Sequence, residues 1–223
     1  MTRSKSAARP DAATVRRRIR GLDAEQRSAQ RRSQLLDAAT ELFAEQSYSG
    51  TSIEQICQRA YVGTKGFYDH FESKEACYIA LLEQITVQIQ QRVMAGAAAV
   101  EGQEWPQRAH AVIEAFVHAI ADDPRLAKVT FGEAGGISTT VDKQRRSNRR
   151  WSAAFLDQQW SGTGDRAGIA LALATIGGMF ELVVDWLHHH DDGGAPDAVA
   201  TLAEDLNRFV DAVYVGRAAI AAK

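Results

Sequence analysis

Apolar side chains recur every three or four residues along most of the chain, the spacing that places them on one face of an α-helix. The stripe that begins at Leu35 predicts a first helix ending near Gln46, and the stripe that begins at Ile53 predicts a much shorter second helix. No segment keeps the strict alternation that a half-buried β-strand requires. The sequence therefore predicts an all-α protein of about nine helices.

Capping and breaking residues set the expected limits of these helices. Asp23 with Gln26, and Thr51 with Glu54, have the spacing of capping boxes, and Ser73 is a further N-cap residue. The stretches "SYSG", "DDP", "SGTGD" and "DDGGAP" are breaks. The later helices are expected over residues 64–70, 73–94, 105–120 and 125–131, from "GISTT" to 160, and over 166–190 and 195–222.

The stretch "AYVGTKGFYDHFESKEA" (residues 60–76) contains a helix that is too short to bury much, yet it is rich in polar groups. Two short helices joined by a tight turn, with a third packed behind, form a DNA-binding helix-turn-helix. Its second helix lies in the major groove, where Lys and Thr read base edges, Gly allows close approach, and flanking polar groups hold phosphates. The residues expected to contact DNA are Thr51, Thr64, Lys65, Gly66, Tyr68, His70 and Lys74.

The segment "TSIEQICQRAYVGTKGFYDHFESKEACYIALL" resembles the N-terminal domain of the TetR family of transcriptional regulators, and "LLDAATELFAEQSYSGTS" matches the first helix of that domain. The resemblance covers roughly residues 31–85. It implies a homodimeric repressor of a double-stranded DNA operator, released by a small-molecule effector that the C-terminal helices bind. Two departures are Tyr61, where a Gly is usual in the turn, and Gly63-Thr64-Lys65 in place of Ser-Lys-Gly.

The charge is distributed unevenly along the chain. Residues 1–32 hold ten Arg or Lys against three acidic residues, which gives +7, whereas the whole chain carries −2. We therefore expect three parts: a disordered basic arm (1–22), a helix-turn-helix domain (23–75) and an effector-binding and dimerisation domain (76–223). A basic arm on an acidic body favours contact with a polyanion, and a solvated tail is the alternative interpretation.

The C-terminal part contains candidates for a ligand pocket and for a dimer surface. Aromatic and polar side chains that line a cavity, or alternatively form plain core, are Phe116, Phe131, Asn148, Trp151, Phe155 and Met179. Small residues spaced four apart suggest close helix packing across a two-fold axis, with packing inside one chain as the alternative. The expected dimer residues are Ala170, Ala174, Gly178, Leu206 and Val210.

Other functions have weaker signals. His110, Glu114 and His118 share a helix face, but a solvated set of His–Glu pairs explains them, and we expect neither a metal nor a cofactor. The uncharged run 167–180 has 14 residues, whereas a membrane span needs about 20 apolar residues. Cys57 and Cys77 lie in apolar helical patterns, as reduced thiols of a cytoplasmic protein do. The sequence has no recognisable catalytic signature, so a helical enzyme is only an alternative interpretation. A ligand-blind, architectural DNA-binding protein is the other alternative.

Overall fold

The computed structural model describes residues 23–132, 136–160, 164, 166–190 and 196–221, and the predicted basic arm lies outside them. The described residues form helices with no strand among them, which confirms the all-α prediction. In chain order the helices are α2 (Ala24–Gly50), α3 (Ile53–Ala60), α4 (Thr64–Tyr68), α5 (Lys74–Ala99), α6 (Gln107–Ala121), α7 (Pro124–Phe131), α8 (Thr139–Gln159), α9 (Arg166–His189) and α10 (Pro196–Ala221).

The first capping box is confirmed and the second is displaced by one residue. Asp23 accepts a hydrogen bond from the backbone N–H of Gln26, whose side chain accepts in return from the backbone N–H of Asp23. At α3 the reciprocal pair is Ser52 with Gln55, so the predicted pairing of Thr51 with Glu54 is wrong. Thr51 is unavailable because its side chain points into the protein.

Helix limits follow the predicted breaks closely. The backbone of α2 leaves helical geometry at Gln46 and Ser47, where φ of Ser47 is 67°, so the expected break at "SYSG" is present as a kink. Helix α5 continues to Ala99, five residues beyond its predicted end at residue 94, because the alanine-rich stretch that follows favours helix.

Apolar side chains form two core clusters that share α5. The N-terminal core joins α2, α3 and α4 to the first half of α5 and includes Val129 of α7 and Val141 of α8. The C-terminal core joins α6, α8, α9 and α10 to the second half of α5. Ile89 of α5 packs against both clusters. Helix α5 therefore connects the two ends of the molecule, and the expected division at residue 75 falls within its first turn.

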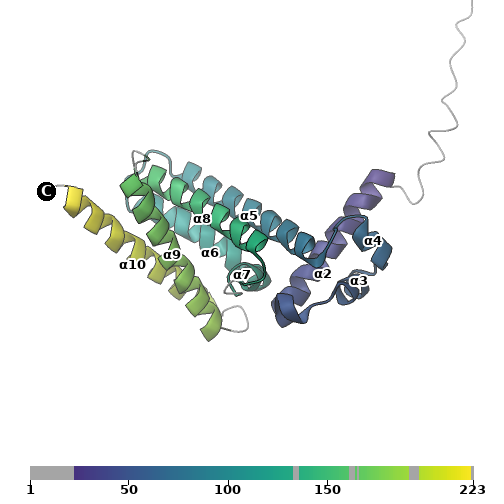
Figure 1. The fold of residues 1–223 in the computed structure, drawn as a ribbon. Coiled ribbons are helices and arrows are strands. Elements are labelled where there is room, and N and C mark those ends of the chain that lie inside the picture. The colour runs from purple at the N-terminus through teal and green to yellow at the C-terminus, as the bar shows by residue number, and fades with distance from the viewer. Residues whose placement is uncertain (1–22, 133–135, 161–163, 165, 191–195, 222–223) are drawn as a thin grey trace, which may run out of the picture.

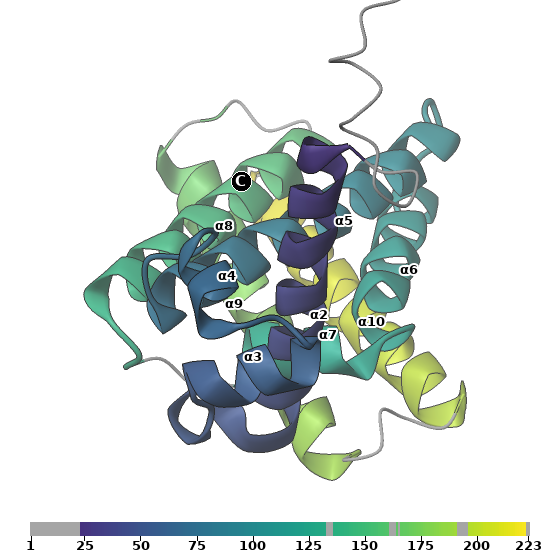
Figure 2. The same cartoon turned by 90° about the vertical axis from the view of Figure 1, so that its right-hand side faces the viewer.

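The two cores give the molecule two distinct ends. Helices α2, α3 and α4 gather at one end, and α9 and α10 form the opposite edge, with α7 near the junction (Figure 1). Seen from the α2–α4 end, the green and yellow helices α9 and α10 lie behind the bundle (Figure 2). Within the described residues, α9 alone has the length and apolar composition to cross a membrane, and core helices of folded proteins pass the same test.

Candidate nucleic-acid interface and neighbouring cavity

The helix-turn-helix is built on a small number of deeply buried side chains. Ile56 of α3 and Phe67 of α4 are both 0% exposed, and Phe67 contacts Phe71 with a ring-centroid distance of 5.5 Å. A helix of five residues has little stability of its own, so this burial fixes its orientation. Helix α4 then presents Thr64, Lys65 and Tyr68 to solvent.

Gly66 has a packing role in this unit. A Cβ atom at Gly66 would lie 2.8 Å from Cγ1 of Val62, closer than real Cβ contacts allow. Gly63 has open space around it and caps α4 without a side-chain hydrogen bond. Gly66 therefore lets α4 lie close to the turn, and the exposed groups beside it are Thr64 and Lys65.

Tyr61 closes α3 in the left-handed conformation, with φ 54° and ψ 34°. The next residue, Val62, donates its backbone N–H to the carbonyl of Cys57 at 3.0 Å, which completes the helix end. A non-glycine residue in this region carries strain of about 1 to 2 kcal/mol. The Tyr61 side chain is 97% exposed, so no burial of this side chain within the chain offsets that strain.

Three other residues predicted to contact DNA point inward. Thr51 is 2% exposed, and its hydroxyl donates to the carbonyl of Ser47 at 2.8 Å. Lys74 donates to the carbonyls of Tyr48 and Thr51 at 2.8 and 2.6 Å, with its amine 4.2 Å from the centre of the Tyr48 ring. The Nε2 atom of His70 is buried and has no partner among the described residues. Thr51 and Lys74 brace the kink and the start of α3, which sequence patterning did not indicate.

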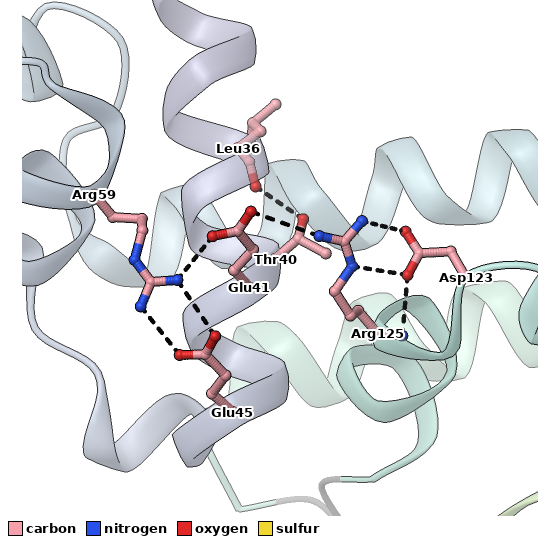
Figure 3. Close-up of polar contacts among 7 residues, drawn as sticks. All are labelled: Leu36, Thr40, Glu41, Glu45, Arg59, Asp123 and Arg125. Atoms are coloured by element: carbon pink, nitrogen blue, oxygen red, sulfur yellow. Dashed lines mark hydrogen bonds and ion pairs between the residues drawn. The ribbon is translucent and has the colours of Figure 1, made fainter. Parts of the chain in front are cut away.

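An ionic network ties α3 to α2 and α7. Arg59 of α3 contacts Glu41 at 2.7 Å and Glu45 at 3.1 Å, both on α2. Arg125 of α7 reaches the other oxygen of Glu41 at 3.6 Å and pairs with Asp123 at 2.7 Å (Figure 3). Hydrogen bonding from Arg59 lowers the pKa of Glu45. The network is solvent-exposed, so it orients the helices more than it stabilises them.

Both cysteines are buried thiols with no disulfide, as expected. Burial raises the pKa of Cys77 to about 12. Burial also raises the pKa of Cys57, although a hydrogen bond with Thr64 opposes the shift. Thiols of this kind remain protonated and unreactive at neutral pH.

The C-terminal core encloses a cavity of about 280 Å³ between α5, α6, α7, α8 and α9. Every residue predicted for the ligand pocket lines it: Phe116, Phe131, Asn148, Trp151, Phe155 and Met179. The rings of Trp151 and Phe155 stack at 5.5 Å with 9° between their planes. The structure thus brings the predicted set together around one space, and ligand binding there remains a prediction.

Polar residues that were not predicted for the pocket also line this cavity. Arg145 of α8 donates to the Tyr78 hydroxyl at 2.9 Å, and Asn148 donates to Thr86 of α5 at 2.8 Å. Arg149 lines the cavity and is exposed. Arg145 and Arg149 are one helical turn apart and flank Asn148, so the helix periodicity of α8 contained the signal.

The residues predicted for the dimer surface divide into two groups. Leu206 and Val210 are 0% and 2% exposed inside the chain's own C-terminal core. A Cβ atom on Gly178 would lie 2.6 Å from the Phe209 ring of α10, so Gly178 serves packing within the chain. Ala174 and Ala170, which lie one and two turns before Gly178 on α9, are exposed. The residues buried within the chain are not available to a second copy.

The histidines of α6 contact carboxylate side chains. His110 contacts Asp211 of α10 at 3.0 Å, and His118 contacts Asp122 at 3.0 Å. Of the expected His–Glu pairs, Glu114 with His118 is present at 4.0 Å, whereas His110 contacts Asp211 of another helix in place of Glu114. Within the described residues, no group of three or more His, Cys, Asp or Glu side chains is placed to hold a metal ion.

The fold and these sites define a helix-turn-helix protein with an attached helical domain that encloses a cavity. Residues 35–81 match the family described as "Bacterial regulatory proteins, tetR family", which supports the resemblance over this part of the chain. The transcriptional activator FasR of Mycolicibacterium smegmatis is 31% identical over 102 residues, 46% of each chain. The transcriptional repressor DhaR of Mycobacterium sp. is 36% identical over 62 residues, 28% of this chain and 31% of DhaR. The chain thus spans less than half the length of these relatives.

Solved structures share the fold over most of the chain at low sequence identity. The fatty acid degradation regulator FadR from Bacillus halodurans has a TM-score of 0.67 and 18% identity, covering 80% of this chain and 93% of that one. FadR from Bacillus subtilis in complex with stearoyl-CoA has a TM-score of 0.61 and 21% identity, covering 79% of this chain and 95% of that one. These similarities extend the shared architecture beyond the helix-turn-helix.

Proposed function

We propose that the protein is a homodimeric, sequence-specific DNA-binding transcriptional repressor, without enzymatic activity, that a small molecule releases from its operator. The observation that carries the proposal is α4, held by the fully buried Phe67 while it presents Thr64 and Lys65 to solvent. Lys donates to guanine acceptors and the Thr methyl contacts thymine, so both suit the major groove. Tyr68 and the strained, exposed Tyr61 flank them and suit phosphate contacts.

Dimerisation is supported by the outer surface of α9. Only 28% of the most apolar window of this helix is buried within the chain. Ala170, Leu173 and Ala174 are exposed along it, and Gly177 has open space beside it. On α10, Val215 is 65% exposed. We name Ala170, Leu173, Ala174, Gly177 and Val215 the outer face, and we assign it to the two-fold contact.

In a dimer, an effector can release the protein from its operator by changing the distance between the two recognition helices. Two recognition helices enter successive major grooves when they lie roughly 34–36 Å apart. A ligand that binds a differently spaced state more tightly lowers operator affinity by the difference in its binding free energies. Because α7 contributes to the cavity wall and contacts α2 through Arg125 and Glu41, a change in the cavity can move the DNA-binding end.

The similar proteins support the regulatory role and the effector-binding role to different extents. The relatives include both an activator and a repressor, so the direction of regulation is part of the proposal. One structural neighbour was solved with stearoyl-CoA, which supports a small-molecule effector for this fold. The basic residues before α2 add affinity for the phosphate backbone in this proposal, and that contribution weakens as salt rises.

Selection of random DNA fragments by the purified full chain, followed by sequencing, tests the proposal. We expect one enriched motif with two related half-sites, and sedimentation should show a dimer both free and bound to DNA. Equal affinity for all duplexes at fixed salt would instead indicate a ligand-blind, architectural DNA binder. Conversion of any bound ligand into a product would indicate an enzyme.

A further inference from the structure

The cavity has a polar end and an apolar end, and the polar end faces the DNA-binding end of the molecule. Along α5 its wall runs from Leu82 to Val93, and along α8 from Arg145 to Gln159. The polar end is formed by Thr86 of α5 and by Arg145 and Asn148 of α8. It lies toward the N-terminal core, because Asn148 contacts Thr86 and Arg145 contacts Tyr78, a member of that core. A ligand in this space therefore binds with a defined direction.

The polar end has the chemistry of a carboxylate site. The guanidinium of Arg145 donates to a neutral hydroxyl, and a carboxylate is a stronger acceptor that can take two parallel hydrogen bonds. Arg149 adds a second positive charge, and the one acidic residue of the wall, Glu181, is exposed. The hydroxyl of Thr130 on α7 is buried and has no partner among the described residues, so it is available as a donor.

The apolar end sets the size and shape of the ligand. A volume of about 280 Å³ lies just below the range of roughly 300–1,000 Å³ found for small-molecule sites. The aromatic residues of the wall are Trp105, Phe116, Phe131, Trp151, Phe155 and Phe180. Flat rings surround the space on several sides, which favours a compact ligand with an aromatic body over a long chain.

One residue connects this site to the DNA-binding end. The Tyr78 hydroxyl accepts from Arg145 and donates to the carbonyl of Val129 on α7 at 2.9 Å. Its ring, 1% exposed, packs edge-on against Phe43 and Tyr48 at 5.1 and 5.2 Å. The carbonyl of Tyr48 is one of the two that Lys74 binds, next to the start of α3.

From this arrangement we infer that the effector is a compact aromatic carboxylic acid, and that Arg145 senses it by exchanging the Tyr78 hydroxyl for the ligand carboxylate. The exchange removes the hydrogen bond that joins α8 to Tyr78 of α5, and Tyr78 is the residue that contacts α7 through Val129 and packs against Phe43 and Tyr48 of α2. The acid shifts the protein from its DNA-binding state to the ligand-bound state by the difference between its binding free energies for the two states. The inference rests on the proposed function and adds the ligand class and the sensing residue.

A matched pair of probes tests the ligand class without any substitution. We expect 3-phenylpropionate to bind the full chain at least tenfold more tightly than its neutral amide, as measured by calorimetry and by the fluorescence of Trp105 and Trp151. Arg145→Gln should reduce that ratio to about one, whereas Arg146→Gln should preserve it, since Arg146 is exposed beside Arg145 and does not line the cavity. Equal binding of acid and amide, or tighter binding of stearoyl-CoA than of the acid, would overturn the assignment.

A second variant tests the sensing step. Tyr78→Phe keeps the buried ring and removes the hydroxyl, so the acid should still bind within about threefold of wild type. The loss of operator affinity caused by saturating acid should shrink at least fivefold, and circular dichroism should report unchanged helix content. An unchanged response to the acid would refute the role of Tyr78. Sequence-specific DNA binding without any response to carboxylic acids would refute this inference alone, whereas absence of sequence-specific binding would refute the proposed function.

Discussion

The two ends of the molecule differ in how completely they are packed. Of the twelve largest fully buried side chains in the described residues, nine belong to the N-terminal core and three to the C-terminal core. The C-terminal core instead surrounds the cavity of about 280 Å³. The N-terminal core thus holds most of the large side chains that are completely buried, and the C-terminal core borders a space that can hold a ligand.

This difference matches what each end must do under the proposed function. A recognition helix of five residues reads bases only if its supports hold it still, and a cavity responds to a ligand only if its walls are not already in full contact. The binding free energy of a ligand can therefore rearrange the walls of the cavity while the helix-turn-helix moves as a unit.

The largest effect is expected when an aromatic ring is removed from each core, which tests the difference in packing between the two ends. Phe67→Ala empties a fully buried position, so we expect a loss of about 3–5 kcal/mol in the free energy of unfolding. Phe155→Ala removes a half-buried ring that already borders the cavity, and the expected loss is below that range, roughly 1–2 kcal/mol. Urea titration followed by circular dichroism measures both values.

Equal losses for the two variants would show that the ends are packed alike. As a control on function, Phe155→Ala should keep operator affinity within a few-fold, because α4 is untouched. Phe67→Ala should abolish specific binding even under conditions in which most of the chain is folded.

The second test concerns the outer face of α9. Ala174→Lys places a charge on an exposed surface of the monomer, so the fold should be unaffected. At a two-fold contact the charge appears twice and is buried without a partner, which costs about 3 kcal/mol or more in dimerisation free energy. Sedimentation over a range of concentrations measures it, with Ala95→Lys, on the exposed side of α5, as the matched control. If both variants remain dimers, another surface forms the contact.

The sequence predicted elements well where local signals agree. Helix limits followed from apolar spacing and from residues such as Asp23 and Ser73, which act on their own neighbours. The six residues predicted for the pocket line one cavity, since side chains at helical spacing converge where helices pack, and ligand binding by them stays a prediction. What could not be predicted depends on long-range contacts: the sequence does not reveal that Gly178 meets Phe209. Nor does it reveal that Lys74 binds the carbonyls of Tyr48 and Thr51.

Two lysines within nine residues of each other separate base reading from bracing. Lys65→Ala removes an exposed donor on α4 and should cost about 1–3 kcal/mol of discrimination at one base pair, with little change in stability. Lys74→Met removes a donor that braces the start of α3, so it should lower the melting temperature and leave the preferred operator unchanged. Fragment selection with each variant gives the answer. An altered motif with Lys74→Met would mean that Lys74 reads DNA directly.

The smallest expected effect concerns the ionic network between α2 and α3. The hydrogen bond from Arg59 lowers the pKa of Glu45 in the folded protein, so the pair stabilises the fold when the pH is above the unfolded pKa of about 4.3. That contribution is lost as the pH falls through the lowered value, because protonated Glu45 no longer attracts Arg59. Glu45→Gln should therefore melt slightly below wild type at pH 7, and the two curves should converge near pH 3. The difference should also shrink in 1 M NaCl, since the pair is exposed to solvent and screened by salt. A gap that widens in acid would mean that Glu45 is held by something other than the charge of Arg59.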